Sequence, residues 1–83
     1  MSRTMNLTKR QREVLEEMRD GAHLHRYVPH TMAWLDGTQR WASYKTWTTL
    51  EELGLIESVG SDARDNEHFR LTPAGRKALE EAK

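Results

Sequence analysis

Helix start and stop signals divide this sequence into segments, and they constrain the possible fold more than any other feature. The first signal is Thr8 with Gln11, which have capping-box spacing, so that each side chain can bond the other residue's backbone N–H. Apolar residues then recur at helical spacing up to Gly21, a residue suited to the positive φ that ends many helices. The sequence therefore predicts a helix over residues 8–20.

Two further helices are predicted in the second half of the chain. Ser43 is a good N-cap for a helix over residues 44–53, and Gly54 follows as its stop. Pro73 stands at the first position of a third helix over residues 74–82, where its missing N–H costs nothing. All three predicted helices are short, so each must be stabilised by packing against other elements.

Strands are predicted between the helices. Residues 24–28 can alternate as a strand, and residues 55–60 and 67–71 read as two strands joined by the polar, turn-rich residues 61–66. The second and third of these form a β-hairpin with an exposed tip. Because Gly54 ends a helix just before this hairpin, the helix must pack directly against it.

Asp36-Gly37 predicts another hairpin, since both central positions of a tight hairpin turn need positive φ. A two-residue turn would place Leu35 opposite Thr38 and Trp34 opposite Gln39. The alternative interpretation of the same stretch is a short helix over residues 31–35.

Composition limits the class of protein. The chain has 83 residues, 13 Lys plus Arg, 13 Asp plus Glu and no Cys, which excludes a disulfide framework, thiolate metal sites and a partner chosen by bulk charge. No apolar run approaches the ~20 residues of a transmembrane helix, and no signal-peptide core is visible. We expect one cytoplasmic domain over residues 1–83, with residues 1–6 disordered and no membrane partner.

Three stretches of the chain resemble winged helix-turn-helix domains of the MarR-like and PadR-like regulators and of small phage or prophage proteins. Residues 7–15 look like the opening helix, residues 46–56 like the end of the recognition helix with its Gly-Leu-Ile strand entry, and residues 69–76 like the strand and helix after the wing. The resemblance implies an α+β fold with three helices and a C-terminal β-hairpin wing. The Asp-Gly signal departs from it and predicts an extra hairpin in place of the second helix.

The resemblance implies that the protein binds DNA as a transcriptional regulator of bacterial or phage type. It also implies a homodimer. The helix over residues 43–53 would read duplex DNA, and the wing tip would contact the backbone or a minor groove. The residues expected to contact DNA are Ser43, Tyr44, Lys45, Thr48, Arg40 and Arg64.

The alternative function is a protein–protein interaction module, such as a phage protein that inhibits a host complex. Trp34 and Trp41 are the candidate interface residues, although they can equally cover the bottom of a small sheet. Charge supports this alternative: residues 43–83 hold six basic and eight acidic side chains, so the half expected to meet DNA is negative.

No chemistry beyond binding is expected. The sequence holds no phosphate-binding glycine loop, nucleophile elbow or His-Glu-x-x-His motif, so we expect neither an enzyme nor a cofactor. His23 and His25 would share a strand face, and His30 and His68 complete the set of four histidines. No carboxylate or Cys completes a ligand set with them at recognisable spacing, so no metal site is predicted.

Overall fold

The computed structural model describes residues 7–36 and 40–81, and the predicted disorder of residues 1–6 lies outside them. The described chain is an α+β domain with three helices and five strands. In chain order the elements are α1 (Lys9–Arg19), β1 (His23–Tyr27), β2 (Ala33–Asp36), β3 (Arg40–Ala42), α2 (Tyr44–Glu52), β4 (Ile56–Ser61), β5 (Asn66–Leu71) and α3 (Pro73–Glu81). None of the helices in this part of the chain is long and apolar enough to cross a membrane.

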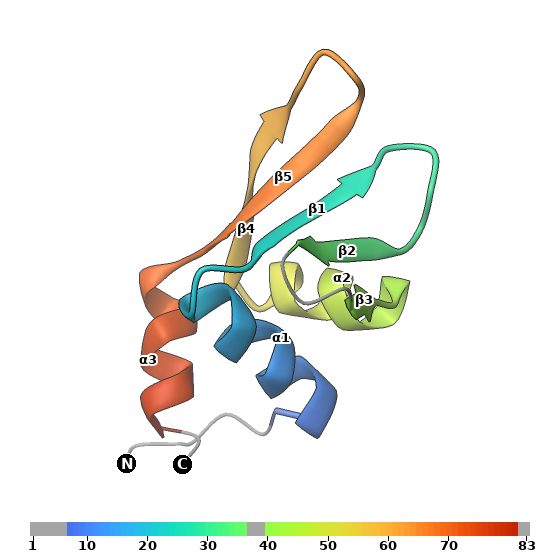
Figure 1. Cartoon of the computed structure of the whole chain (residues 1–83). Coiled ribbons are helices and arrows are strands. Elements are labelled where there is room, and N and C mark those ends of the chain that lie inside the picture. The colour runs from blue at the N-terminus through green and yellow to red at the C-terminus, as the bar shows by residue number, and fades with distance from the viewer. Residues whose placement is uncertain (1–6, 37–39, 82–83) are drawn as a thin grey trace.

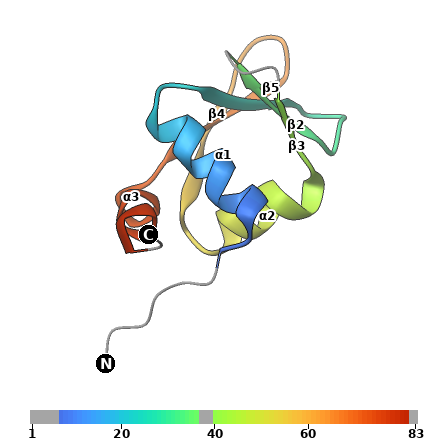
Figure 2. The same cartoon turned by 60° about the horizontal axis from the view of Figure 1, so that its bottom comes forward.

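The five strands form one antiparallel sheet in the order β3-β2-β1-β5-β4. The helices gather on one side of this sheet, and the β4–β5 hairpin extends away from them (Figures 1 and 2). Alternate strand residues face the helices and bury the core between the layers. The buried apolar residues are Val14, Leu15, Met18, Leu24, Ala33, Leu35, Ala42, Trp47, Leu50, Leu55, Ile56, Phe69, Ala78 and Leu79.

The predicted start of α1 is confirmed atom by atom. Thr8 Oγ1 accepts a bond from the Gln11 backbone N–H at 3.1 Å, and Gln11 Oε1 accepts one from the Thr8 N–H at 2.9 Å. The helix ends at Arg19, and Gly21 follows with φ +107°. The local sequence alone therefore determines both ends of this helix.

The other two helices also begin and end near their predicted positions. Ser43 caps α2 by accepting from the Thr46 N–H at 3.4 Å, and Gly54 follows its end with φ +77°. Thr72 caps α3, because its Oγ1 accepts from the Gly75 N–H at 3.0 Å and donates to the Gly54 carbonyl at 2.6 Å. The Thr72 hydroxyl therefore ties the start of α3 to the end of α2.

The predicted two-residue turn after β2 is wrong. Leu35 pairs with Arg40 rather than with Thr38, so the register differs by two residues. An even shift keeps the same side chains on the core face, and here it sets Trp34 directly opposite Trp41 with ring centroids 4.3 Å apart. The aromatic pair outweighs the local preference of Asp-Gly for a two-residue turn.

The alternative helix over residues 31–35 is also wrong, because β2 begins at Ala33. Ala33 and Leu35 are buried while Trp34 is half-buried on the other face, which is the period of a strand. An extra hairpin, β2–β3, therefore stands between α1 and α2, as the Asp-Gly signal predicted.

The β4–β5 hairpin carries one irregularity. Ser58 pairs with Phe69 and Gly60 pairs with His68, so Val59 is an extra residue in a β-bulge, and Gly60 has φ +108°. A bulge increases local twist, and this one lies in β4, an edge strand of the sheet.

Candidate nucleic-acid interface

The outer face of α2 carries three of the predicted site residues. Tyr44 is 57% exposed, Lys45 is exposed and Thr48 is half-buried, whereas Trp47 and Leu50 point into the core. Among the described residues Lys45 has no ion-pair partner. The first two turns of α2 therefore present one uncompensated positive charge beside an exposed aromatic ring.

The hydroxyl groups at the start of α2 are engaged within the helix. Ser43 Oγ caps the Thr46 N–H and lies 3.0 Å from Thr46 Oγ1. Thr48 Oγ1 donates to the Tyr44 carbonyl at 2.5 Å. Both hydroxyls therefore have a structural role already, and either would contact a ligand through its remaining lone pairs.

Basic residues of α1 lie close to the start of α2. Arg10 donates to the Trp41 carbonyl on β3, which leads through Ser43 into α2. The first turns of α1 also carry Lys9 and Arg12. Arg40 lies on β3 opposite Leu35, but its side chain lies outside the described part of the structure. The contact with Trp41 thus places Arg10 beside the strand that leads into α2, and Arg10 also forms an ion pair with Glu13 at 3.4 Å.

The tip of the β4–β5 hairpin is hydrogen-bonded internally and carries both signs of charge. Asp62 Oδ1 accepts from the backbone N–H of Arg64 at 2.8 Å and of Asn66 at 3.1 Å. A hydrogen bond from His68, followed by these backbone bonds, lowers the pKa of Asp62 from 3.8 to about 2. Arg64 is exposed without an ion-pair partner among the described residues, but Asp62 and Asp65 flank it. Its local positive potential is therefore weak.

Two other basic residues of the sheet are already paired. Arg70 forms an ion pair with Glu57 across β4 and β5 on the face away from the helices. Arg26 forms an ion pair with Glu67 at 2.9 Å on the helix-facing side, where each side chain is 21% exposed. Neither guanidinium is available as an unpaired phosphate contact.

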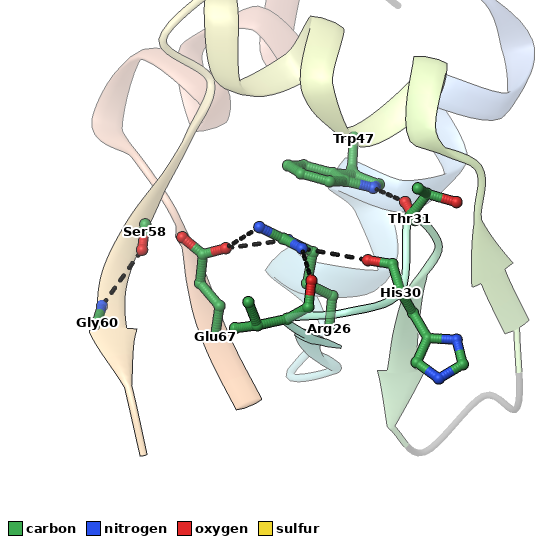
Figure 3. Close-up of polar contacts among 8 residues, drawn as sticks. Arg26, His30, Thr31, Trp47, Ser58, Gly60 and Glu67 are labelled. Carbon is green, nitrogen blue, oxygen red and sulfur yellow. Dashed lines mark hydrogen bonds and ion pairs between the residues drawn. The ribbon is translucent and has the colours of Figure 1, made fainter. Parts of the chain in front are cut away.

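Arg26 is the centre of a polar network that the sequence did not lead us to expect (Figure 3). Its guanidinium donates to Glu67 Oε1 and to the carbonyls of Val28 and His30, and it lies over the Trp47 ring at 4.9 Å. Trp47 Nε1 donates to the Thr31 carbonyl at 2.7 Å. The network holds the β1–β2 loop against α2 and so fixes the orientation of that helix on the sheet.

A signal for this network was present in the sequence. Leu24 and Arg26 are two residues apart in a predicted strand, so they share the face that must be buried. A charged residue on a core face requires a partner, because an isolated buried charge is very costly. The partner itself, Glu67, is 41 residues away in sequence and depends on the pairing of β1 with β5.

The sheet face opposite the helices brings together the two predicted interface residues. Trp34 and Trp41 pack edge to face, and Trp41 is 52% exposed. A hollow of about 220 Å³ lies beside them, lined by His25, Arg26, Tyr27, His30, Met32, Trp34, Trp41 and Asn66. The lining contains no carboxylate, and its one formal charge, on Arg26, is neutralised by Glu67. The hollow is apolar, and it is smaller than the ~300 Å³ of an ordinary ligand pocket.

The histidines are divided between two places. His23, His25 and His68 have their rings within 6.0 Å of one another on the same sheet face, whereas His30 contacts Tyr27 in the β1–β2 loop. Within residues 7–36 and 40–81, no three His, Asp or Glu side chains are arranged to hold a metal ion.

Comparison of the chain with protein-family models, with curated proteins and with solved structures found no match. Any assignment of function therefore rests on the geometry above.

Proposed function

We propose that this protein binds duplex DNA as a winged-helix module, with α2 entering the major groove and the β4–β5 hairpin acting as the wing. The observation that carries the proposal is the connection between them. α2 passes through Gly54 directly into β4, and β5 returns to pair with β1, which follows α1. In chain order the elements are a helix, a strand, a hairpin, a helix, a hairpin and a helix. The family resemblance implies the same order, except that the β2–β3 hairpin stands in place of the helix before α2.

The charge pattern of α2 favours insertion of its N-terminal end. Lys45 lies in its first turn, and Glu51 and Glu52 lie in its last turn. The positive end of the helix dipole adds to Lys45, while the acidic C-terminal end would be repelled by phosphates. Tyr44 and Thr48 flank Lys45 on the exposed face, where a threonine methyl would meet a thymine methyl and Lys45 a guanine or a phosphate.

Backbone contacts in the proposed complex come from Arg40 and Arg64, with Ser43 at the helix N-terminus. Arg64 is at the tip of the hairpin that extends beyond the helices, so it would reach the backbone or minor groove beside the groove that holds α2 (Figure 1). Only a few such contacts are offered by a domain with zero net charge. A homodimer that doubles their number is therefore part of the proposal, as is a role as a cytoplasmic transcriptional regulator.

The test is the affinity for a fluorescently labelled duplex, measured by anisotropy over a range of salt concentrations. Each phosphate contact contributes a slope of about −0.9 in log K against log salt, so roughly three contacts per protomer predict a slope of about −2.7 for the monomer and about −5.4 for the dimer. Absence of binding at the lowest salt concentration would overturn the proposal.

A second candidate function is favoured by the hollow beside Trp41. An apolar, uncharged hollow rimmed by Tyr27, Met32 and two Trp side chains has the composition of an interface core, and it has room for one large apolar side chain of a partner protein. If this is the function, a partner captured after nuclease treatment is lost with Trp41→Ala and retained with Tyr44→Ala. Loss with Tyr44→Ala alone would contradict it.

A further inference from the structure

Three histidine rings meet on the sheet face that the helices leave uncovered. His23 and His25 are alternate residues of β1, and His68 lies on β5 directly opposite His25. The ring centroids of His23 and His68 are 4.9 Å apart, and each is 6.0 Å from that of His25. The cluster lies on β1 and β5 rather than on α2, the helix proposed to enter the major groove.

Hydrogen bonds connect the cluster to the tip of the β4–β5 hairpin. His23 Nε2 lies 2.6 Å from His68 Nδ1, and His68 Nε2 lies 2.9 Å from Asp62 Oδ2. An ionised Asp62 only accepts, so His68 Nε2 must carry a hydrogen. In neutral His68 the Nδ1 atom is then an acceptor, and His23 Nε2 donates to it. The same Asp62 carboxylate holds the backbone N–H groups of Arg64 and Asn66.

We infer that His23, His68 and Asp62 form a proton-controlled clasp, which adds a side-chain link to the backbone ladder between β1 and the β4–β5 hairpin and loses its His23–His68 contact when both imidazoles are charged. One added proton is tolerated, because a single N–H still lies between His23 and His68 whichever ring carries it. A second added proton places a hydrogen on both facing nitrogens, so neither accepts and the two positive charges repel. The positive charge on His68 therefore disfavours the charged form of His23.

The other charged groups around the clasp have opposing effects. His25 Nδ1 lies 3.4 Å from Asp36 Oδ2, and the same carboxylate also favours the charged form of His23. Arg70, two residues beyond His68 on β5, is neutralised by Glu57 on β4. Burial, then the proximity of His68 and His25, lowers the pKa of His23, and Asp36 offsets this only in part. The surroundings therefore favour the uncharged form of His23.

The lowered pKa of His23 determines how the stability of the fold depends on pH. Because the pKa of His23 in the folded protein lies below the ordinary value of 6.5, the unfolded chain binds its proton first. The contribution of the clasp to stability is fully present above pH 6.5 and is lost as the pH falls below that value. Asp62 remains ionised throughout this window.

The test is an NMR titration of the wild-type protein from about pH 7.5 to about pH 4.5, in the presence of a metal chelator, with the amides of Arg64 and Asn66 as reporters. We expect the His23 and His68 ring signals to show two coupled steps, and both amides to shift with the second step. His23→Gln removes one imidazole of the His23–His68 pair, so the second step and the amide shifts should disappear. His30→Gln, which alters the histidine outside the cluster, should titrate like the wild type.

Thermal unfolding gives a second readout. Between the two ends of that pH range, wild type and His30→Gln should lose about 5 °C more in Tm than His23→Gln loses. Independent single-site titration of His23 and His68, or amide shifts that persist in His23→Gln, would overturn the inference. If a variant fails to fold, the wild-type titration alone decides between coupled and independent behaviour.

Discussion

Arg26 lies over the indole ring of Trp47, with its guanidinium carbon 4.9 Å from the ring centroid, and so joins β1 to α2. The same guanidinium is paired with Glu67 on β5. The orientation of α2 on the sheet therefore depends on a cation that is desolvated by an aromatic ring on one side and neutralised by a carboxylate on the other. Any function of the outer face of α2 depends on this contact.

Loss of the Arg26 charge is predicted to destabilise the fold. Arg26→Met keeps much of the side-chain volume but leaves Glu67, which is 21% exposed, without its cation, at a cost of about 2 kcal/mol in the free energy of unfolding. The double variant with Glu67→Met should recover most of that loss, because it removes the uncompensated charge. Urea unfolding followed by tryptophan fluorescence measures both.

The matched control for this prediction is Arg70→Met. Arg70 is also paired across the β4–β5 ladder, with Glu57, but its side chain is 68% exposed. Exposed pairs contribute little, so the cost should be below about 0.5 kcal/mol. Equal losses at Arg26 and Arg70 would show that the Arg26 network has no special role.

Gly75 is predicted to be required where α3 packs against the backbone of Leu55, just before β4. A Cβ at this position would overlap the Leu55 carbonyl oxygen and press on the Leu71 side chain. Helix propensity favours Gly75→Ala by about 1 kcal/mol, but the overlap with backbone should reverse the sign and cost about 2 kcal/mol or more. Chemical denaturation measures the change, and a variant as stable as the wild type would contradict the close packing of α3.

The register of the β2–β3 hairpin makes a spectroscopic prediction. Trp34 and Trp41 are directly opposite each other with ring centroids 4.3 Å apart, so their transitions should couple and give an exciton signal in circular dichroism. Trp41→Phe should abolish that signal at a cost of about 1 kcal/mol in stability. Persistence of the signal in this variant would mean that the register is different.

Asp62 predicts a second acid-sensitive window, below that of the histidines. Its pKa is lowered from 3.8 to about 2, so its contribution to the hairpin tip is complete above pH 3.8 and is lost as the pH falls to about 2. The protection factors of the Arg64 and Asn66 amides against hydrogen exchange should fall in that window, and Asp62→Ala should lower them at neutral pH. Unchanged exchange in Asp62→Ala would contradict the capping role of this carboxylate.

Much of the fold was predictable because its signals are local. Thr8 with Gln11, Ser43 and Gly54 each specify a helix end through atoms within a few residues, and these ends lie where the sequence placed them. The register of β2–β3 was not predictable from Asp-Gly, because it is set by the pairing of Trp34 with Trp41 across the strands. Here the local turn preference is weaker than the aromatic pair across the strands.

The candidate sites were less predictable than the fold, because their partners are distant in sequence. The exposure of Tyr44 and Lys45 followed from helical periodicity once Trp47 was placed in the core. The contacts of His23 with His68 and of Arg26 with Glu67 require β1 to pair with β5, a choice that no local pattern specifies. Alternation did place His23 and His25 on one face, but not the third ring beside them.

The most direct test of the proposed function is the substitution of Lys45. Lys45 is exposed in the first turn of α2, and Lys77 is an exposed lysine on α3, so Lys45→Ala and Lys77→Ala change the net charge equally. If α2 recognises DNA through Lys45, Lys45→Ala should weaken duplex binding about tenfold and reduce the salt slope by about one. Lys77→Ala should change the affinity less than about twofold. Equal effects of the two substitutions, or no effect of Lys45→Ala, would contradict DNA recognition by α2.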